Sequence, residues 1–123
     1  AVYAAGSAYS TGMWQTSDER FKSDISPLDN AISKINQLEP RSYNFKAKEY
    51  AYMGLPEELQ YGFMAQDLEK VFPELVFTDK QGYKAVDYPK IMPVLVEAIK
   101  DQQVQINELK QKLENLEKRV IKN

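Results

Sequence analysis

A heptad repeat near the end of the chain constrains the fold more than any other feature of the sequence. Its core positions alternate in steps of four and three, with one polar exception: Leu95, Ile99, Gln102, Ile106, Leu109, Leu113, Leu116 and Val120. A helix that packs alone drifts by about 20° per heptad against such spacing, so a strict repeat favours helices that wind around each other. The sequence therefore predicts an oligomeric coiled coil.

The charges beside this stripe favour a parallel arrangement of the helices. In a parallel coil a g residue faces the e residue five positions later on the neighbour, which pairs Lys112 with Glu117 attractively. The number of helices is not decided by the core. Isoleucine at a with leucine at d is the two-stranded preference, but Leu113 at a and Gln102 at d weaken it. Dimer and trimer both remain open on these residues alone.

The residue types that the chain lacks exclude several classes of enzyme and of site. The 123 residues include no cysteine and no histidine, so we expect no Ser-His-Asp or Cys-His centre, no metal site and no cofactor. A net charge of −2 gives no general attraction to phosphate backbones or anionic lipid, and no stretch reaches the length of a membrane helix. We therefore expect neither a nucleic-acid partner nor a membrane partner.

The distribution of charge and of apolar period divides the chain into three parts. Residues 1–17 carry no charged side chain, and five charged residues follow within seven positions. We expect the leading segment, residues 1–16, to pack as a strand against other chains, because disordered segments are usually charged and poor in aromatics. The other two expected parts are a globular region at 17–88 and the coiled-coil helix at 89–123.

Local patterns predict an α+β fold for the globular region, β-rich with short helices. Ser26 followed by Pro27 has the form of a helix start, and apolar residues at steps of four and three continue it to about Leu38. Next we expect a strand over 41–46 and a loop over 47–60 that has room for a helical turn. A strand end that passes into a helix is expected over 62–72.

A hairpin and the start of the long helix complete the predicted order of elements. Strands at 75–78 and 83–86 flank a turn in which Gly82 supplies a positive φ. The long helix is expected to begin near Lys90, because Pro93 then lies in its first turn, where a missing N–H breaks no hydrogen bond.

A serine and a lysine stand five residues apart at the start of the globular region, as Ser17 and Lys22. Ser-Lys pairs activate a hydroxyl without histidine. Side chains five residues apart lie on opposite faces of a strand and well apart around a helix, so these two can meet only if the backbone bends between them. On the residues alone, two surface side chains are the more economical interpretation.

Four sequence blocks then point to a known family. Residues 17–25, SDERFKSDI, resemble the start of the intramolecular chaperone domain of endosialidases and related phage tailspike and tail-fibre proteins, a self-cleaving peptidase family. Three further blocks are similar in the same order: LEPRSYNF at 38–45, GFMAQDLEKVFPELV at 62–76 and VDYPKIMPVLVEAIK at 86–100. The resemblance thus covers nearly the whole globular region.

The resemblance implies a trimeric chaperone, with a parallel three-stranded coil, that removes itself by cleavage between Thr16 and Ser17. By position, Ser17 would be the nucleophile and Lys22 the general base, which must lose its proton through burial or through nearby Arg20. Further candidates for supporting the reaction or stabilising the oxyanion are Gln66, Asp18 and Arg20. We also expect the bend between Ser17 and Lys22 to depend on the packing of three chains.

The resemblance also implies partners and a location. Residues 1–16 would end a fibre or spike shaft, and the partners would be two further copies of the chain and its upstream fibre domains. Assembly would take place in the host cytoplasm, and the shaft would remain in the virion tail. One alternative is a structural domain that trimerises a fibre or adhesin without cleavage. A DNA-associated regulator is a weaker alternative, since the chain has no basic stripe.

Overall fold

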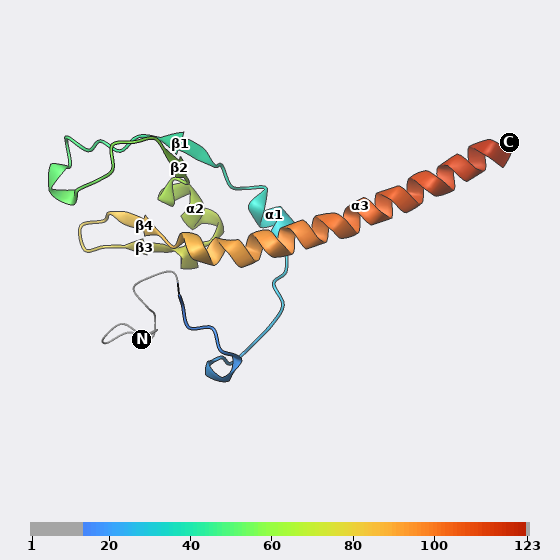
Figure 1. The fold of residues 1–123 in the computed structure, drawn as a ribbon, viewed down its shortest axis with the longest axis horizontal. Coiled ribbons are helices and arrows are strands. Elements are labelled where there is room, and N and C mark those ends of the chain that lie inside the picture. Colours follow the sequence, from blue (N-terminus) through green and yellow to red (C-terminus); the bar gives the residue numbers. More distant parts are fainter. Residues whose placement is uncertain (1–13, 123) are drawn as a thin grey trace.

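A 32-residue helix, α3 (Ile91–Lys122), dominates the computed structural model, which describes residues 14–122. The helix projects far beyond the rest of the chain (Figure 1), and at 1.5 Å per residue it is about 48 Å long. A 3-10 turn, Tyr88–Lys90, leads directly into it, and Pro93 lies in its first turn. The predicted start of the helix near Lys90 is therefore confirmed. The strand predicted for residues 1–16 falls mainly on residues 1–13, which lie outside the described residues.

Two small antiparallel sheets precede α3. β1 (Arg41–Tyr43) pairs with β2 (Gln60–Gly62), and β3 (Val76–Thr78) pairs with β4 (Lys84–Val86). Each strand has three residues, so the part before α3 is a mixture of helices and small sheets and not the β-rich unit that the sequence suggested. The strand expected over 41–46 ends at Tyr43, the last of its three residues that pair with β2.

The hairpin between β3 and β4 confirms the predicted turn. Gly82 has a φ of 90°, a conformation that side chains rarely adopt. The Asp79 carboxylate accepts hydrogen bonds from the backbone N–H groups of Gln81 and Tyr83, both at 2.9 Å. This short-range capping by an aspartate holds the two strands in register.

Helix α1 (Ala31–Ile35) is shorter than the sequence predicted. The expected helix from Ser26 to about Leu38 is wrong in its first turn, because Asn30 has a φ of 55° and a helix cannot continue through that conformation. Asparagine tolerates the left-handed region better than most residues, so the chain bends there at low cost. Leu28, expected on the buried stripe, consequently stays 46% exposed.

The buried core lies between helix α2 (Ala65–Val71), the 3-10 turn Pro73–Leu75 and the start of α3. Its central side chains are all at most 7% exposed: Leu68, Phe72, Leu75 and Ile91. The prediction of a strand end that passes into a helix stopped at Pro73 is confirmed, as is the helical turn in the loop, which is Ala51–Met53.

Helix α1 packs against the first turns of α3 (Figure 1). Both helices bury a small side chain, since Ala31 on α1 is 1% exposed and Ala98 on α3 is 5% exposed. The ammonium group of Lys34, also on α1, lies 5.6 Å from the centre of the Phe72 ring, which links α1 to the core through a cation–π contact. The base of the long helix is thus held by the rest of the chain while most of its length projects from it.

Candidate functional site

Residues 17–22 form a turn that brings Ser17 and Lys22 into contact. The Lys22 Nζ donates a hydrogen bond to the Ser17 Oγ at 2.7 Å. A fully extended chain would separate the two Cα atoms by roughly 17 Å over five residues, so the bend required by the sequence argument is present. A 3-10 turn, Glu19–Phe21, supplies it. This bend forms within one chain, contrary to the expectation that it needs three packed chains.

Backbone hydrogen bonds and an aspartate cap hold this turn. The N–H of Phe21 donates to the carbonyl of Asp18 and that of Lys22 to the carbonyl of Glu19, both at 3.0 Å. Asp18 is the N-cap, and its Oδ1 accepts from the backbone N–H of Arg20 at 2.9 Å. The turn therefore begins immediately after Ser17 and ends immediately before Lys22.

The side chains of Asp18 and Arg20 form a two-point ion pair across the same turn. The Arg20 Nε donates to Asp18 Oδ1 at 3.1 Å, and an Arg20 terminal nitrogen donates to Oδ2 at 2.8 Å. The Arg20 side chain, and then its backbone N–H, hold the pKa of Asp18 below its ordinary value. The same ion pair raises the pKa of Arg20. Both groups are therefore charged together over a wide pH range.

The segment that carries the turn is solvent-exposed in the single chain. Every residue from 17 to 30 is exposed, and in Figure 1 this segment loops away from the two sheets before it returns to α1. Large apolar side chains along it are exposed as well: Trp14, Phe21, Ile25 and Leu28. Water thus reaches the Ser17–Lys22 pair, and the lysine is the donor in their hydrogen bond. A base must accept the serine proton, so Lys22 could act only after losing its own.

Gln66, a candidate for stabilising an oxyanion, lies elsewhere. It is an exposed residue of α2 that lines a cavity of about 360 Å³ together with Tyr43, Phe63 and Tyr88. Within the part of the chain that the structure describes, no hydrogen bond joins Gln66 to Ser17 or Lys22. Of the candidate residues, the structure brings together Ser17, Asp18, Arg20 and Lys22. Within one chain, Gln66 is not part of this group.

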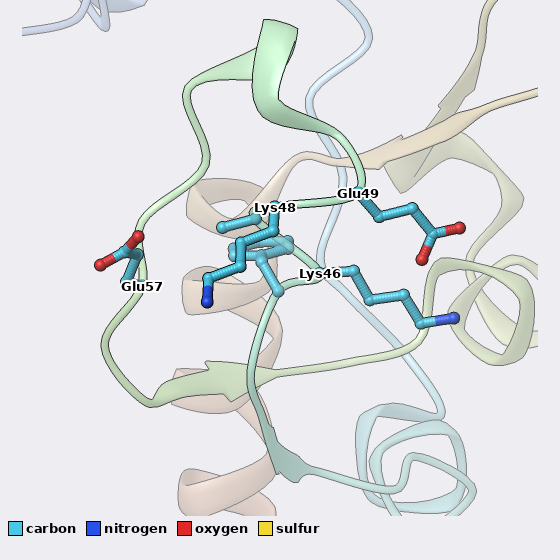
Figure 2. Close-up of a pocket in the computed structure, with 6 residues that line it drawn as sticks. Lys46, Lys48, Glu49 and Glu57 are labelled. Carbon is cyan, nitrogen blue, oxygen red and sulfur yellow. The ribbon is translucent and has the colours of Figure 1, made fainter.

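A second cavity, of about 450 Å³, lies under the loop between β1 and β2. Figure 2 shows its charged lining residues, with Lys48 and Glu57 on facing limbs of the loop and Lys46 and Glu49 to one side. The two lysines balance the two glutamates, so the cavity has no net preference for an anion or a cation. Its composition indicates no chemistry.

The core positions of the heptad repeat form a continuous exposed stripe on α3. Seven apolar side chains on it are between 41% and 68% exposed: Leu95, Ile99, Ile106, Leu109, Leu113, Leu116 and Val120. Gln102 interrupts the row and is exposed too. Met92, at 63% exposed, extends the stripe by one a position. Sequence reasoning missed it, although it lies seven residues before Ile99 and continues the same spacing.

A different face of α3 contacts the rest of the chain. Ile91, Val94 and Ala98, which recur at steps of three and four, are buried or half-buried. The stripe of Met92, Leu95 and Ile99 therefore points away from the domain even where the helix packs on it. One face of the helix thus packs against the rest of the chain, and the adjacent face, which carries the stripe, is exposed.

Neither a membrane span nor a metal site is found among the described residues. Residues 14–122 contain no helix that is both long and apolar enough to cross a membrane. The same residues contain no group of three acidic, histidine or cysteine side chains that would hold a metal ion.

Comparison with known proteins identifies the region that carries the turn. Long tail fiber protein Gp37 of Enterobacteria phage K3 is 32% identical over 117 residues, and the match covers 91% of this chain and 9% of that protein. The protein of the same name from Enterobacteria phage T2 is also 32% identical, over 91% of this chain and 8% of its own length. That of Salmonella phage S16 is 28% identical over 93% of this chain and 16% of its own length.

This chain therefore spans less than a fifth of the relatives it matches. The sequence resemblance to an intramolecular chaperone of phage tail fibres is confirmed by a family model that matches residues 17–77. The match begins at Ser17, and the name of the model classes the family among the peptidases. Its description is chaperone of endosialidase, and residues 17–77 of this chain belong to that family.

Proposed function

We propose that this chain is the intramolecular chaperone of a phage tail fibre, that it trimerises through α3, and that it cleaves itself between Thr16 and Ser17. Family membership and the tail-fibre relatives support the chaperone role. The observation that carries the cleavage is the 2.7 Å contact between Ser17 and Lys22 at the first residues of the matched region. The exposed heptad stripe supports an oligomer, and the family resemblance is what suggests three chains.

The proposed reaction begins at the peptide bond before Ser17. Neutral Lys22 takes the hydroxyl proton of Ser17, whose Oγ attacks the carbonyl carbon of Thr16. The carbon–nitrogen bond breaks as the Ser17 nitrogen takes up a proton, which leaves an ester between Thr16 and the Ser17 Oγ. Water then hydrolyses the ester. The products are a shaft segment that ends at Thr16 and a chaperone that begins with a free amine at Ser17.

Assembly would control this reaction through burial of the turn. In one chain the pair is already in contact but is surrounded by water, which favours the charged form of a lysine. Neighbouring copies that cover the segment would remove that water and favour the neutral amine. The exposed apolar side chains of the segment, Phe21 and Ile25 among them, give a neighbour something to cover. Cleavage would then report that three chains have assembled.

Trimerisation by a helix also suits the folding problem of a fibre. A shaft built from strands of three chains has many contacts between residues far apart in sequence, so it forms slowly. Strands of small residues specify their register only weakly, and the sequence of residues 1–10 is rich in alanine and serine. A coiled coil forms quickly from local contacts, and it would hold the three chain ends level while the shaft pairs.

Mass spectrometry tests the proposal on a chain that includes residues 1–123. We expect the denatured protein to yield a fragment that begins at Ser17, and the native protein to have the mass of a trimer. Ser17→Ala and Lys22→Ala should both remain intact. Ser23→Ala and Lys46→Ala are matched controls, since both are exposed residues outside the pair, and both should be cut like the unsubstituted chain.

The outcomes separate the proposed activity from its alternative. An intact chain with the mass of a trimer under all conditions would support a structural trimerisation domain that does not cleave. A monomer at micromolar concentration would contradict the proposed assembly. Cleavage that persists in Ser17→Ala would show that another nucleophile, or a contaminating protease, cuts the chain.

A further inference from the structure

We propose that Asp18 and Arg20 are positioning residues for the cleavage, because together they hold the turn that places Lys22 against Ser17. This inference rests on the proposed function and names how its site is built. Neither side chain contacts the dyad through a hydrogen bond in the described structure. Asp18 acts on the backbone between the two members, and the Arg20 side chain acts through the Asp18 carboxylate.

The cap is the first part of the device. A turn of three residues leaves its first N–H groups without carbonyl partners, and an aspartate oxygen is among the best substitutes. Asp18 Oδ1 fills that role for the N–H of Arg20 at 2.9 Å. Its backbone is extended, with φ −67° and ψ 132°, which is the conformation typical of a capping residue. Asp18 therefore marks the position where the chain changes direction after Ser17.

The guanidinium of Arg20 is the second part. It binds both carboxylate oxygens of Asp18 and so fixes the rotamer that presents Oδ1 to the backbone. Exposed ion pairs usually contribute little by themselves, and the Arg20 side chain is 87% exposed. For this ion pair, the two-point geometry that fixes the Asp18 rotamer matters more than the free energy that the pair contributes. A lysine at this position could not bind the carboxylate at two points.

Local control is required because no other part of residues 14–122 encloses the turn. All residues from 17 to 30 are exposed, so packing against a core does not set their backbone conformation. The turn must then be stabilised by contacts among its own residues. Those contacts are the cap, the ion pair and the two backbone hydrogen bonds already described. Without the cap, the distance between the Ser17 and Lys22 side chains would vary.

The rate of self-cleavage in the full trimeric chain tests the proposal. Asp18→Ala removes cap and ion pair, and we expect the first-order rate constant to fall roughly 3- to 30-fold, the range typical of losing a helix cap. Asp18→Asn keeps a capping oxygen and should stay within about threefold of the unsubstituted chain. Asp29→Ala removes the same charge from an exposed position outside the turn and should leave the rate unchanged.

Amide hydrogen exchange gives a readout that does not depend on activity. In the Ser17→Ala chain, which is expected to remain uncut, the N–H groups of Arg20, Phe21 and Lys22 should exchange faster when Asp18→Ala is added. Asp18→Asn should largely restore their protection, and Asp29→Ala should not affect it. The native mass should be that of a trimer in every variant, because the turn lies far from α3's exposed stripe along the chain.

The two measurements also distinguish the failure of this inference from the failure of the proposed function. If the unsubstituted chain is never cut, the proposed activity fails, and faster exchange in Asp18→Ala alone would still establish the cap. If Asp18→Ala is cut at the unsubstituted rate, or if its amides exchange no faster, the positioning role is overturned. Equal rates for Asp18→Asn and Asp18→Ala would likewise overturn the role of the capping oxygen.

Discussion

The hydroxyl of Tyr88 lies in the space that a Cβ atom at Gly62 would occupy. The same hydroxyl accepts a hydrogen bond from the backbone N–H of Phe63 at 3.0 Å, and the Tyr88 and Phe63 rings stack with their centroids 6.0 Å apart. Gly62 ends β2, whereas Tyr88 begins the turn that leads into α3. This contact therefore connects the base of the long helix to the first sheet.

Replacing Gly62 with alanine should destabilise the domain. The added methyl group overlaps the Tyr88 hydroxyl and comes within 3.3 Å of the Tyr43 hydroxyl, so the tyrosines or the strand must move. We expect a loss of about 1–3 kcal/mol in the free energy of unfolding, measured by urea denaturation. Tyr88→Phe alone should cost about 1 kcal/mol through the lost hydrogen bond. The double variant should lose less than the sum, and additive losses would argue against the overlap.

Lys22→Arg should abolish self-cleavage. Arginine keeps the positive charge and the capacity to donate a hydrogen bond to Ser17, but it does not lose its proton in proteins and so cannot act as a base. The denatured mass after prolonged incubation should be that of the intact chain, with the trimer preserved. A cleaved Lys22→Arg chain would mean that Lys22 contributes only its charge.

Leu109→Asp together with Leu116→Asp should dissociate the proposed trimer. Both leucines are more than half exposed in the single chain and lie at d positions, so assembly would bury each introduced carboxylate beside its copies. We expect the dissociation constant to rise at least about 100-fold, measured by analytical ultracentrifugation. Val104→Asp is the matched control, because Val104 is 55% exposed on α3 but lies outside the a and d positions. Equal dissociation in this control would contradict the assignment of the stripe.

The turn at 17–22 should loosen as pH falls below the ordinary range of aspartate. Arg20 holds the folded-state pKa of Asp18 below its ordinary value of 3.8. A group with a lowered pKa stabilises the folded turn above its unfolded value and loses that contribution as pH falls through the folded value. The chemical shift of Asp18 and the exchange of the Phe21 amide should therefore change together below pH 3.8. Arg20→Gln should move that transition to higher pH, and an unmoved transition would contradict the cause assigned here.

Patterns confined to neighbouring residues predicted their elements well. The β3–β4 turn was predicted from Gly82, the end of α2 from Pro73 and the start of α3 from Pro93, because each of these residues restricts its own backbone. The helix predicted from Ser26 failed for a related reason. An alternative conformation at Asn30, which its side chain permits, outweighed the favourable start signal.

The candidate site was predicted only in part. The residue types and the required bend between Ser17 and Lys22 followed from the sequence, and the two side chains are in contact in the structure. The 3-10 turn that makes the bend was not predicted, because three residues carry no periodic pattern. The cap by Asp18 offered a signal, since an aspartate before a short charged turn is a common N-cap.

The sequence by itself determined that one face of the last third is an apolar stripe with a strict heptad spacing, and that any chemistry must work without histidine, cysteine or a metal held by them. Both follow from residue identity along one local period. Only the tertiary structure decided that Ile91, Val94 and Ala98 are buried against the domain while Met92 and Leu95 remain open. That choice depends on where α1 and the buried cluster around Leu68 meet α3. Such contacts join residues far apart in the sequence, and no local spacing rule reveals them.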